Sequence, residues 1–262
     1  MIYISDALVA TLADGEQPLN HARIGYDNIS YGKTPTASSA VAGYPAIAAT
    51  YPTTYDYWQP TALPATWSID NLSPAKCDYI GVVGDVIGCT VRVQSSTDGI
   101  TWVTRMEDIA DKRVVMMLFP QVTARYWRVV FANIVPRVAV IYIGKALAMQ
   151  RAIYRGHSPV TLSRTTELTT NISQGGQYIG RAVTRTGVET SAQWQHLTAG
   201  WYRQFFDPFV KSAETKPFFF AWRPQTYPEE VGYMWTTGDI KPVNTGPRSF
   251  MSVDLPMVGI GA

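Results

Sequence analysis

The pair Asp98-Gly99 constrains this chain most strongly, because it lies between two segments whose residues are typical of β-strands. Asp-Gly between alternating apolar runs is a strong hairpin signal, since glycine adopts positive φ at no steric cost. Trp102 follows the turn, and residues 124–129 then alternate aromatic and basic side chains. The two segments together predict an antiparallel β-sandwich. They do not indicate what such a sandwich would bind.

Strand-like segments recur at intervals of about ten residues through the first half, which is the spacing typical of a sandwich. Trp127, Val129 and Phe131 share one face of their segment, and the apolar run 114–119 suits a buried strand and is too short for a helix. We expect one strand over 1–9, a turn at Asp14-Gly15, and irregular coil with short strands over 23–49. Further strands are expected at 67–72, 79–83, 90–94, from 102, at 114–119, 125–131 and 138–143.

The second half has a different pattern. Aromatic and aliphatic residues from Trp201 to Val210 recur at helical spacing after Thr198, a candidate N-cap, and Asp207-Pro208 predicts a kink or restart. The polar segment 164–177 is expected to be an extended loop, and strands are expected at 188–194, 218–222, 231–237 and 249–258. The predicted fold is therefore mainly β, with a leading strand over 1–20 that is a candidate to complete the second sheet, a sandwich over 21–148, and a β-rich domain over 149–262 with one helix near 198–213.

Composition limits the classes of function. The net charge is only +2, so no strong field attracts nucleic acid, and we expect no nucleic-acid partner. No run approaches the ~20 apolar residues that span a membrane, and the first residues lack a signal-peptide pattern, so we expect no membrane insertion. Cys77 and Cys89 are the two cysteines, and the sequence leaves open whether they are bridged or free.

Catalytic motifs are not found. The three histidines lie outside metal and triad motifs, and adjacent acids such as Glu107-Asp108 and Glu229-Glu230 point apart in a strand or turn. A hydrolase would need a cleft with convergent carboxylates of perturbed pKa, and no such pair can be named from the sequence. We therefore expect no catalytic residue, no metal site and no enzymatic activity.

Residues 51–60 are unusually aromatic and are interrupted by prolines, which excludes a helix and disfavours a central strand. Such a loop either packs on the sandwich or contacts a ligand. Tyrosine and tryptophan combine an apolar ring with a hydrogen-bonding group, so they suit the stacking of a sugar ring. Tyr55, Tyr57 and Trp58 are the candidate carbohydrate-binding residues.

Residues 35–145 resemble the discoidin family (coagulation factor 5/8 type C), which has a galactose-binding-like jelly-roll fold. The matching elements are Trp58 before a Pro-rich turn, Trp67-x-Ile69-Asp70-x-Leu72, Ser96-x-Asp98-Gly99-x-x-Trp102, Ala124-Arg125-Tyr126-x-Arg128 and Gly144. The sequence departs from the family pattern at Asn71, which is inserted, at Ser73, which replaces a glycine, and in lacking the family's terminal cysteine pair. The resemblance implies binding of sugars, lipid headgroups or proteins by loops at one end of the sandwich. Some members of this fold hold a structural calcium, for which Asp56 and Asp98 are the candidate ligands, and no other cofactor is expected.

The second half resembles tailed-phage virion proteins, in particular distal tail proteins. The resemblance rests on residues 163–168, 201–209 and 217–222. It implies a structural component of a tail tip or baseplate, assembled in the host cytoplasm into a homo-oligomeric ring, a hexamer in related proteins, between the tail tube and the tip. The galactose-binding-like domain would point outward, and the tail tube and tail hub proteins would be its partners. We rank this role first, a carbohydrate-binding protein that recognises host surface glycans second, and a hydrolase with an accessory lectin domain third.

Overall fold

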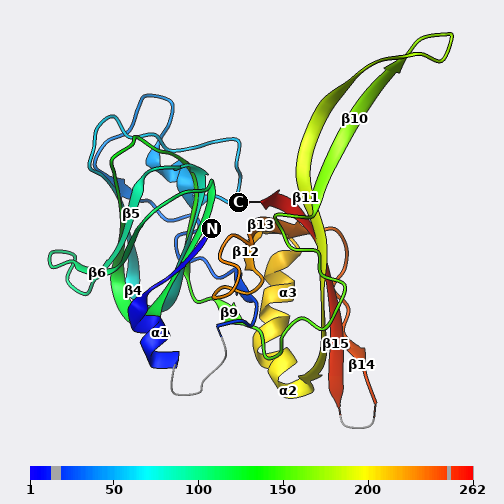
Figure 1. Ribbon diagram of the computed structural model, residues 1–262. Helices are drawn as coiled ribbons and strands as arrows, with labels where there is room; N and C mark the ends of the chain where they lie inside the picture. The colour runs from blue at the N-terminus through cyan, green and yellow to red at the C-terminus, as the bar shows by residue number, and fades with distance from the viewer. Residues whose placement is uncertain (13–18, 247–248, 262) are drawn as a thin grey trace.

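The computed structural model describes residues 1–12, 19–246 and 249–261, and the chain is mainly β with two sheets. The expected turn at Asp14-Gly15 lies outside these residues. Figure 1 shows the first sheet on one side of the molecule, the second sheet beside it, and a helical segment against the second sheet. No helix among the described residues is long and apolar enough to cross a membrane.

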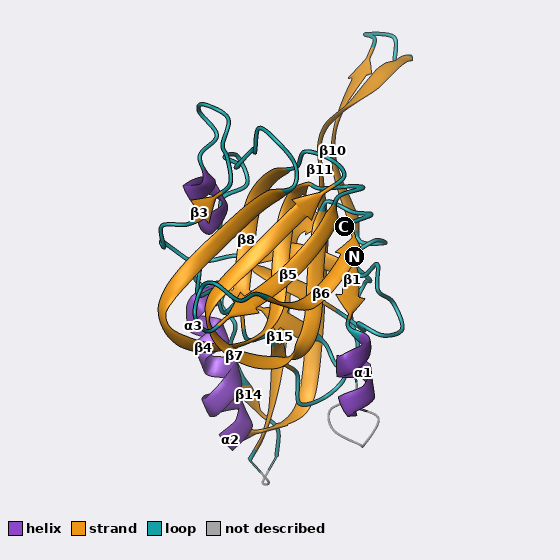
Figure 2. Cartoon of the chain, turned by 90° about the vertical axis from the view of Figure 1, so that its left-hand side faces the viewer, coloured by secondary structure: helices purple, strands orange, loops and turns teal. Residues whose placement is uncertain are grey.

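The first sheet is built on two long antiparallel strands, β4 (Ala65–Asp85) and β7 (Val114–Ala132). Its strand order is β3-β4-β7-β5-β6, with β8 also paired to β4 and β1 in parallel with β7. The remaining strands are β1 (Ile2–Ile4), β3 (Thr36–Ala37), β5 (Thr90–Ser96), β6 (Val103–Ile109) and β8 (Arg137–Gly144). Figure 2 shows that β4 and β7 curve strongly along their length, which lets them enclose a core.

The predicted hairpin at Asp98-Gly99 is confirmed, because it joins the antiparallel strands β5 and β6. Gly99 has a φ of +76°, and Asp98 Oδ1 accepts hydrogen bonds from the Ser96 hydroxyl and from the backbone N–H groups of Ile100 and Thr101. The Asp98 carboxylate therefore stabilises the turn through hydrogen bonds to residues of the turn itself. These hydrogen bonds also hold the pKa of Asp98 well below its usual range.

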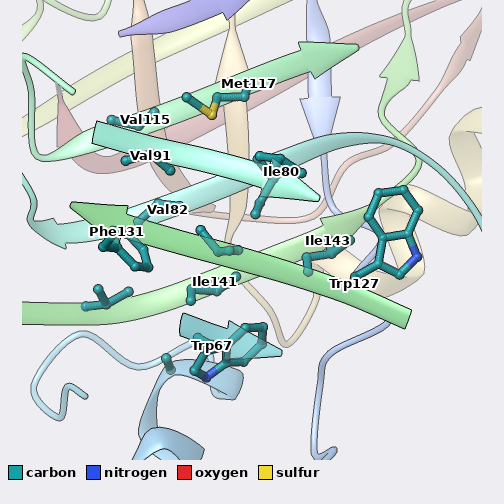
Figure 3. Packing of buried hydrophobic residues seen from close by; sticks show 14 of the residues in the cluster. Trp67, Ile80, Val82, Val91, Val115, Met117, Trp127, Phe131, Ile141 and Ile143 are labelled. Atoms are coloured by element: carbon teal, nitrogen blue, oxygen red, sulfur yellow. The ribbon is translucent and has the colours of Figure 1, made fainter. Parts of the chain in front are cut away.

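The sandwich core is a dense cluster of alternating residues from β4, β5, β7 and β8 (Figure 3). Trp127, Val129 and Phe131 are all fully buried in it, as the sequence pattern predicts. The expected strands at 67–72 and 79–83 are one strand, β4, whose pairing with β7 is interrupted between Asp70 and Ala75. Leu72 has a φ of +64° at this irregularity, so the chain bends there without ending the strand.

The second sheet has the order β10-β11-β15-β13-β12-β2-β9, with β14 also paired to β15. Its strands are β2 (Arg23–Gly25), β9 (Leu147–Ala148), β10 (Arg164–Ile172), β11 (Tyr178–Thr198), β12 (Phe218–Ala221), β13 (Val231–Thr236), β14 (Val243–Asn244) and β15 (Phe250–Gly261). The predicted strands at 188–194, 218–222, 231–237 and 249–258 are confirmed within β11, β12, β13 and β15.

A helical segment covers one face of this sheet and confirms the predicted helix near 198–213. It consists of α2 (Ala199–Trp201), a π-helical turn η2 (Tyr202–Phe206) and α3 (Asp207–Ala213). Pro208 explains the change of geometry, since it lacks an N–H and its ring obstructs the carbonyl one turn earlier. Phe206 and Phe209 are fully buried against the sheet, in a core distinct from that of the sandwich. Thr198 precedes α2 but makes no side-chain capping hydrogen bond.

A third buried cluster joins the two sheets and was not expected from the sequence. Residues such as Tyr79, Met116 and Tyr142 of the first sheet pack there against Phe219 and Tyr233 of the second. The contact is close at Gly81, where a Cβ would lie 2.4 Å from the Phe219 ring. The two sheets therefore share a core in addition to having one each.

The segment before the sandwich differs from its expected structure. Residues 1–9 are not one strand, because β1 is short and α1 (Asp6–Leu12) follows it. The strand β1 pairs with β7 of the first sheet, so the proposal that it completes the second sheet is wrong. Instead β2, which lies within the range expected for the sandwich, pairs with β12 and β9 of the second sheet. The wider division into domains at 21–148 and 149–262 stays a prediction.

The strands β10 and β11 extend beyond the sheet as a two-stranded arm, which we define as residues 164–187 (Figure 1). The expected loop over 164–177 is wrong at residues 164–172, which form a strand. The segment has two pairs of adjacent threonines, at 165–166 and 169–170, and threonine favours extended backbone. Each residue from Arg164 to Asn171 pairs across the arm. Every residue of β10 is exposed, so hydrophobic burial gave no signal for this strand.

Candidate functional site

Trp58 is not a surface residue, which corrects its assignment as a carbohydrate-binding residue. Its side chain is fully buried in the sandwich core, with its ring 6.0 Å from that of Phe131. Its indole N–H donates to the Ser39 carbonyl, and its backbone pairs with Val138. The tryptophan therefore anchors the aromatic loop to the sandwich and offers no surface to a ligand.

Of the other two predicted residues, Tyr55 is exposed and Tyr57 is half-buried, packed partly against the cluster that joins the two sheets. We call Tyr31, Tyr44, Tyr51, Tyr55 and Tyr57 the tyrosine rim. Tyr55 is 79% exposed, and Tyr57 stacks on Tyr44 with ring centroids 4.5 Å apart and planes inclined by 16°. Tyr31 and Tyr51 form an edge-to-face pair with centroids 6.3 Å apart. Sequence analysis did not assign Tyr31 and Tyr44, because residues 23–49 carry no strand or helix pattern.

Basic side chains approach the tyrosine rim. The guanidinium carbon of Arg137 lies 5.8 Å from the centroid of the Tyr57 ring, and Lys216 Nζ lies 4.0 Å from that of Tyr31. A hydrogen bond with Tyr44 raises the pKa of Tyr57, so its hydroxyl stays protonated at neutral pH. The rim thus offers flat apolar faces next to hydrogen-bond donors.

The residues named for calcium are not brought together by any contact in the structure. Asp98 uses one carboxylate oxygen within its own turn, and Asp56 is exposed on the aromatic loop. The described residues include no group of three or more histidine, cysteine or acidic side chains arranged to hold a metal ion. Calcium binding stays a prediction.

Cys77 and Cys89 are free thiols, both buried. Burial raises the pKa of Cys89 to about 11 and raises that of Cys77 further. Both thiols are therefore protonated at neutral pH and act as small apolar core residues.

A cleft of about 830 Å³ opens where the two sheets meet. Its polar side chains include Arg23 of β2, Asp27 just after it, and Asp78 of β4. Its apolar wall includes Trp201 and Phe205 of the helical segment. Sequence reasoning missed this site, because its residues come from distant segments and no motif connects them.

Burial raises the pKa of both carboxyl groups in the cleft. Burial raises the pKa of Asp78 to about 6, and it also raises that of Asp27. One oxygen of each is engaged, since Asp78 Oδ1 accepts from Ala146 N–H at 2.7 Å and Asp27 Oδ2 accepts from Lys145 N–H at 3.1 Å. These backbone hydrogen bonds fix the orientation of the two carboxyls.

No family model and no curated protein matches this chain. Solved structures of carbohydrate-binding modules align with just under half of it. The chitosan-binding module 1 of a chitosanase/glucanase from Paenibacillus sp. IK-5 is 22% identical, with a TM-score of 0.40 over 44% of this chain and 97% of the module. A fucose-binding module of Streptococcus pneumoniae is 17% identical, with a TM-score of 0.39 over 45% of this chain and 94% of that one. The CBM32 of AlyQ, in complex with 4,5-unsaturated mannuronic acid, is 14% identical, with a TM-score of 0.39 over 43% and 95% of the respective chains.

Proposed function

We propose that this chain is a non-catalytic carbohydrate-binding protein that binds glycans through its tyrosine rim. The observation that carries the proposal is the stacked pair of Tyr44, which is exposed, and Tyr57, which is half-buried, beside the guanidinium of Arg137. A sugar has one face of C–H groups and a periphery of hydroxyls. An aromatic ring packs against the C–H face, and tyrosine hydroxyls and basic side chains form hydrogen bonds with the sugar hydroxyls.

The rim is positioned by the core beneath it. Trp58 is buried directly after Tyr57, so the end of the aromatic loop is anchored to the sandwich. Tyr57 is also held by its stacking on Tyr44. A pre-positioned aromatic surface loses little conformational entropy when a ligand binds, which favours affinity.

The test is a glycan array followed by titration calorimetry with the strongest glycan. We expect the wild-type chain to bind at least one glycan, and Tyr55→Ala and Tyr57→Ala to weaken binding about tenfold, the effect of losing ~1.4 kcal/mol of aromatic contact. Tyr154→Ala is the matched control, because Tyr154 is 59% exposed and belongs neither to the rim nor to the arm. If no glycan binds, or if the rim variants bind as tightly as the control, the proposal is wrong.

A second candidate function is the structural subunit of a phage tail tip suggested by the resemblance of the second half. The arm favours it, because isolated two-stranded hairpins are marginally stable in water and are usually covered by a partner. Ile172, Tyr178 and Ile179 are 62%, 68% and 67% exposed near its tip. Such side chains suit contact with neighbouring subunits in a ring.

Electron microscopy and mass measurement of the purified chain test this second function. We expect a ring-shaped homo-oligomer, and we expect deletion of residues 165–186 to give monomers. A wild-type chain that stays strictly monomeric at high concentration would count against assembly through the arm. This result would leave the glycan-binding proposal unaffected.

A further inference from the structure

The cleft between the two sheets is formed by residues from both halves of the chain. The first sheet contributes Asp78, Leu118 and Phe119, and the second half contributes Trp201 and Phe205. Its volume of about 830 Å³ lies within the range of ~300–1,000 Å³ that is usual for small-molecule sites. It is separate from the tyrosine rim, since none of the five tyrosines of the rim lines it.

Arg23 is the most unusual residue of this cleft. Its side chain lies in the wall with only 8% exposed, and burial lowers its pKa. Within the described residues its guanidinium donates no hydrogen bond, and its buried Nη1 has no partner. Buried guanidinium groups are normally paired, because an unsatisfied charged donor is costly. The Nη1 atom of Arg23 therefore lies closed off from solvent and lacks an acceptor among the described residues.

The nearby carboxyls do not supply this acceptor. Asp78 is close enough to raise the pKa of Arg23 electrostatically, yet no ion pair joins them among the described residues. The second oxygens of Asp27 and Asp78 likewise receive no hydrogen bond from the described residues. The cleft therefore combines unused donors and unused acceptors within one space.

This combination selects the class of ligand. The two carboxylates would repel an anion, and Arg23 and the adjacent Lys145 would repel a cation. An uncharged molecule is therefore favoured. A hydroxyl group both donates and accepts, and so it can pair with a guanidinium and a carboxylate at once. The apolar faces of Trp201, Phe205 and Leu118 would cover the C–H surface of such a molecule.

We propose that the cleft lined by Arg23, Asp27 and Asp78 is a second binding site, which takes a neutral, hydroxyl-rich molecule of monosaccharide to disaccharide size. Its hydroxyls satisfy the guanidinium of Arg23 and the second oxygens of the two carboxyls. Its C–H face packs against the helical segment. Because residues from both sheets contact the ligand, its binding also stabilises their association.

The experiment is titration of the full chain with lactose, maltose and N,N′-diacetylchitobiose as probes, followed by calorimetry and by thermal unfolding. We expect saturable binding of at least one probe. Arg23→Met keeps the length of the side chain and removes its donors, and it should weaken that binding at least about tenfold, because hydrogen bonds to charged groups are lost. The same variant should unfold at an unchanged or higher temperature, since an unpaired buried charge is removed.

Two further variants and a control distinguish binding in the cleft from binding elsewhere on the chain. Asp78→Asn should also weaken binding, and it decides the matter if Arg23→Met does not fold. Asp254→Asn is the control, because Asp254 is exposed on β15, and it should bind like the wild type. Tyr57→Ala should retain cleft binding, which distinguishes this site from the rim.

The proposal is overturned if none of the three probes gives saturable binding. It is also overturned if Arg23→Met or Asp78→Asn, correctly folded, binds the probe as tightly as Asp254→Asn. The second result would show that the open donors and acceptors of the cleft are satisfied by water alone.

Discussion

Replacing Phe219 by alanine tests whether the two sheets form one cooperative structure. Phe219 is fully buried between them, with its ring centroid 5.0 Å from that of Tyr233 and 5.5 Å from that of Tyr142. Truncation of a buried phenylalanine to alanine costs ~3–5 kcal/mol when the cavity does not collapse. The rigid aromatic neighbours limit collapse here, so we expect a loss of about 4 kcal/mol in the free energy of unfolding.

The assay is urea unfolding of the full chain followed by fluorescence and by far-ultraviolet circular dichroism. We expect the midpoint to fall and the two probes to remain coincident, because both sheets lose the shared core together. Leu162→Ala is the control, since Leu162 is 73% exposed, and it should change stability by less than ~0.5 kcal/mol.

A double-mutant cycle with Gly81 makes the test specific. In Gly81→Ala the new Cβ lies 2.4 Å from the Phe219 ring, so the single variant should be strongly destabilised. The same substitution in the Phe219→Ala background meets no ring and should cost much less, giving a coupling of at least ~1 kcal/mol. Additive effects, a loss below ~1 kcal/mol for Phe219→Ala, or two separate transitions would refute the shared core.

Three further predictions concern single features. Trp58→Ala should lower the free energy of unfolding by ~3–5 kcal/mol, measured by urea titration, because it opens a cavity in the sandwich core; an unchanged midpoint would contradict the burial of Trp58. Burial lowers the pKa of His157 to about 4. Between about pH 6.5 and pH 4 the unfolded chain therefore binds a proton at His157 that the folded chain does not bind. The free energy of unfolding should fall as the pH drops through this range. His157→Phe should remove about 3 kcal/mol of this fall between pH 7 and pH 4 in urea titrations, whereas parallel pH profiles would contradict the assignment. Ile179→Ser on the arm should leave the thermal midpoint within about 2 °C of the wild type and weaken self-association seen by sedimentation; a large stability loss would show that the arm packs on its own chain.

Much of the fold was predictable because burial imposes patterns on sequence. Alternation identified the inward residues of β7 and β11, and helical spacing identified the segment around Phe206 and Phe209. The apolar run 114–119 indicated a buried strand. This run is apolar at every position because both faces of the strand are buried. Met116 and Leu118 face the shared core, and Val115 and Met117 face the sandwich core. A run of this kind indicates burial on both faces, yet it does not identify the partner of the second face.

Other features left no readable pattern. The arm is exposed on all sides, so its strands lack hydrophobic alternation. The burial of Trp58 depends on contacts with Ser39 and Phe131, which are distant in sequence. The cleft residues Arg23 and Asp78 are single charged residues in segments that resemble ordinary strand ends. Only the packing of the two sheets brings them together.

The glycan-binding proposal is tested most directly by a crystal structure of the chain soaked with the glycan that binds most strongly on the array. We expect a sugar ring stacked on Tyr57 or Tyr55, with its hydroxyls within hydrogen-bonding distance of Arg137. Glycan density found only away from the tyrosine rim, with the rim left uncovered by ligand and by neighbouring molecules, would contradict the account.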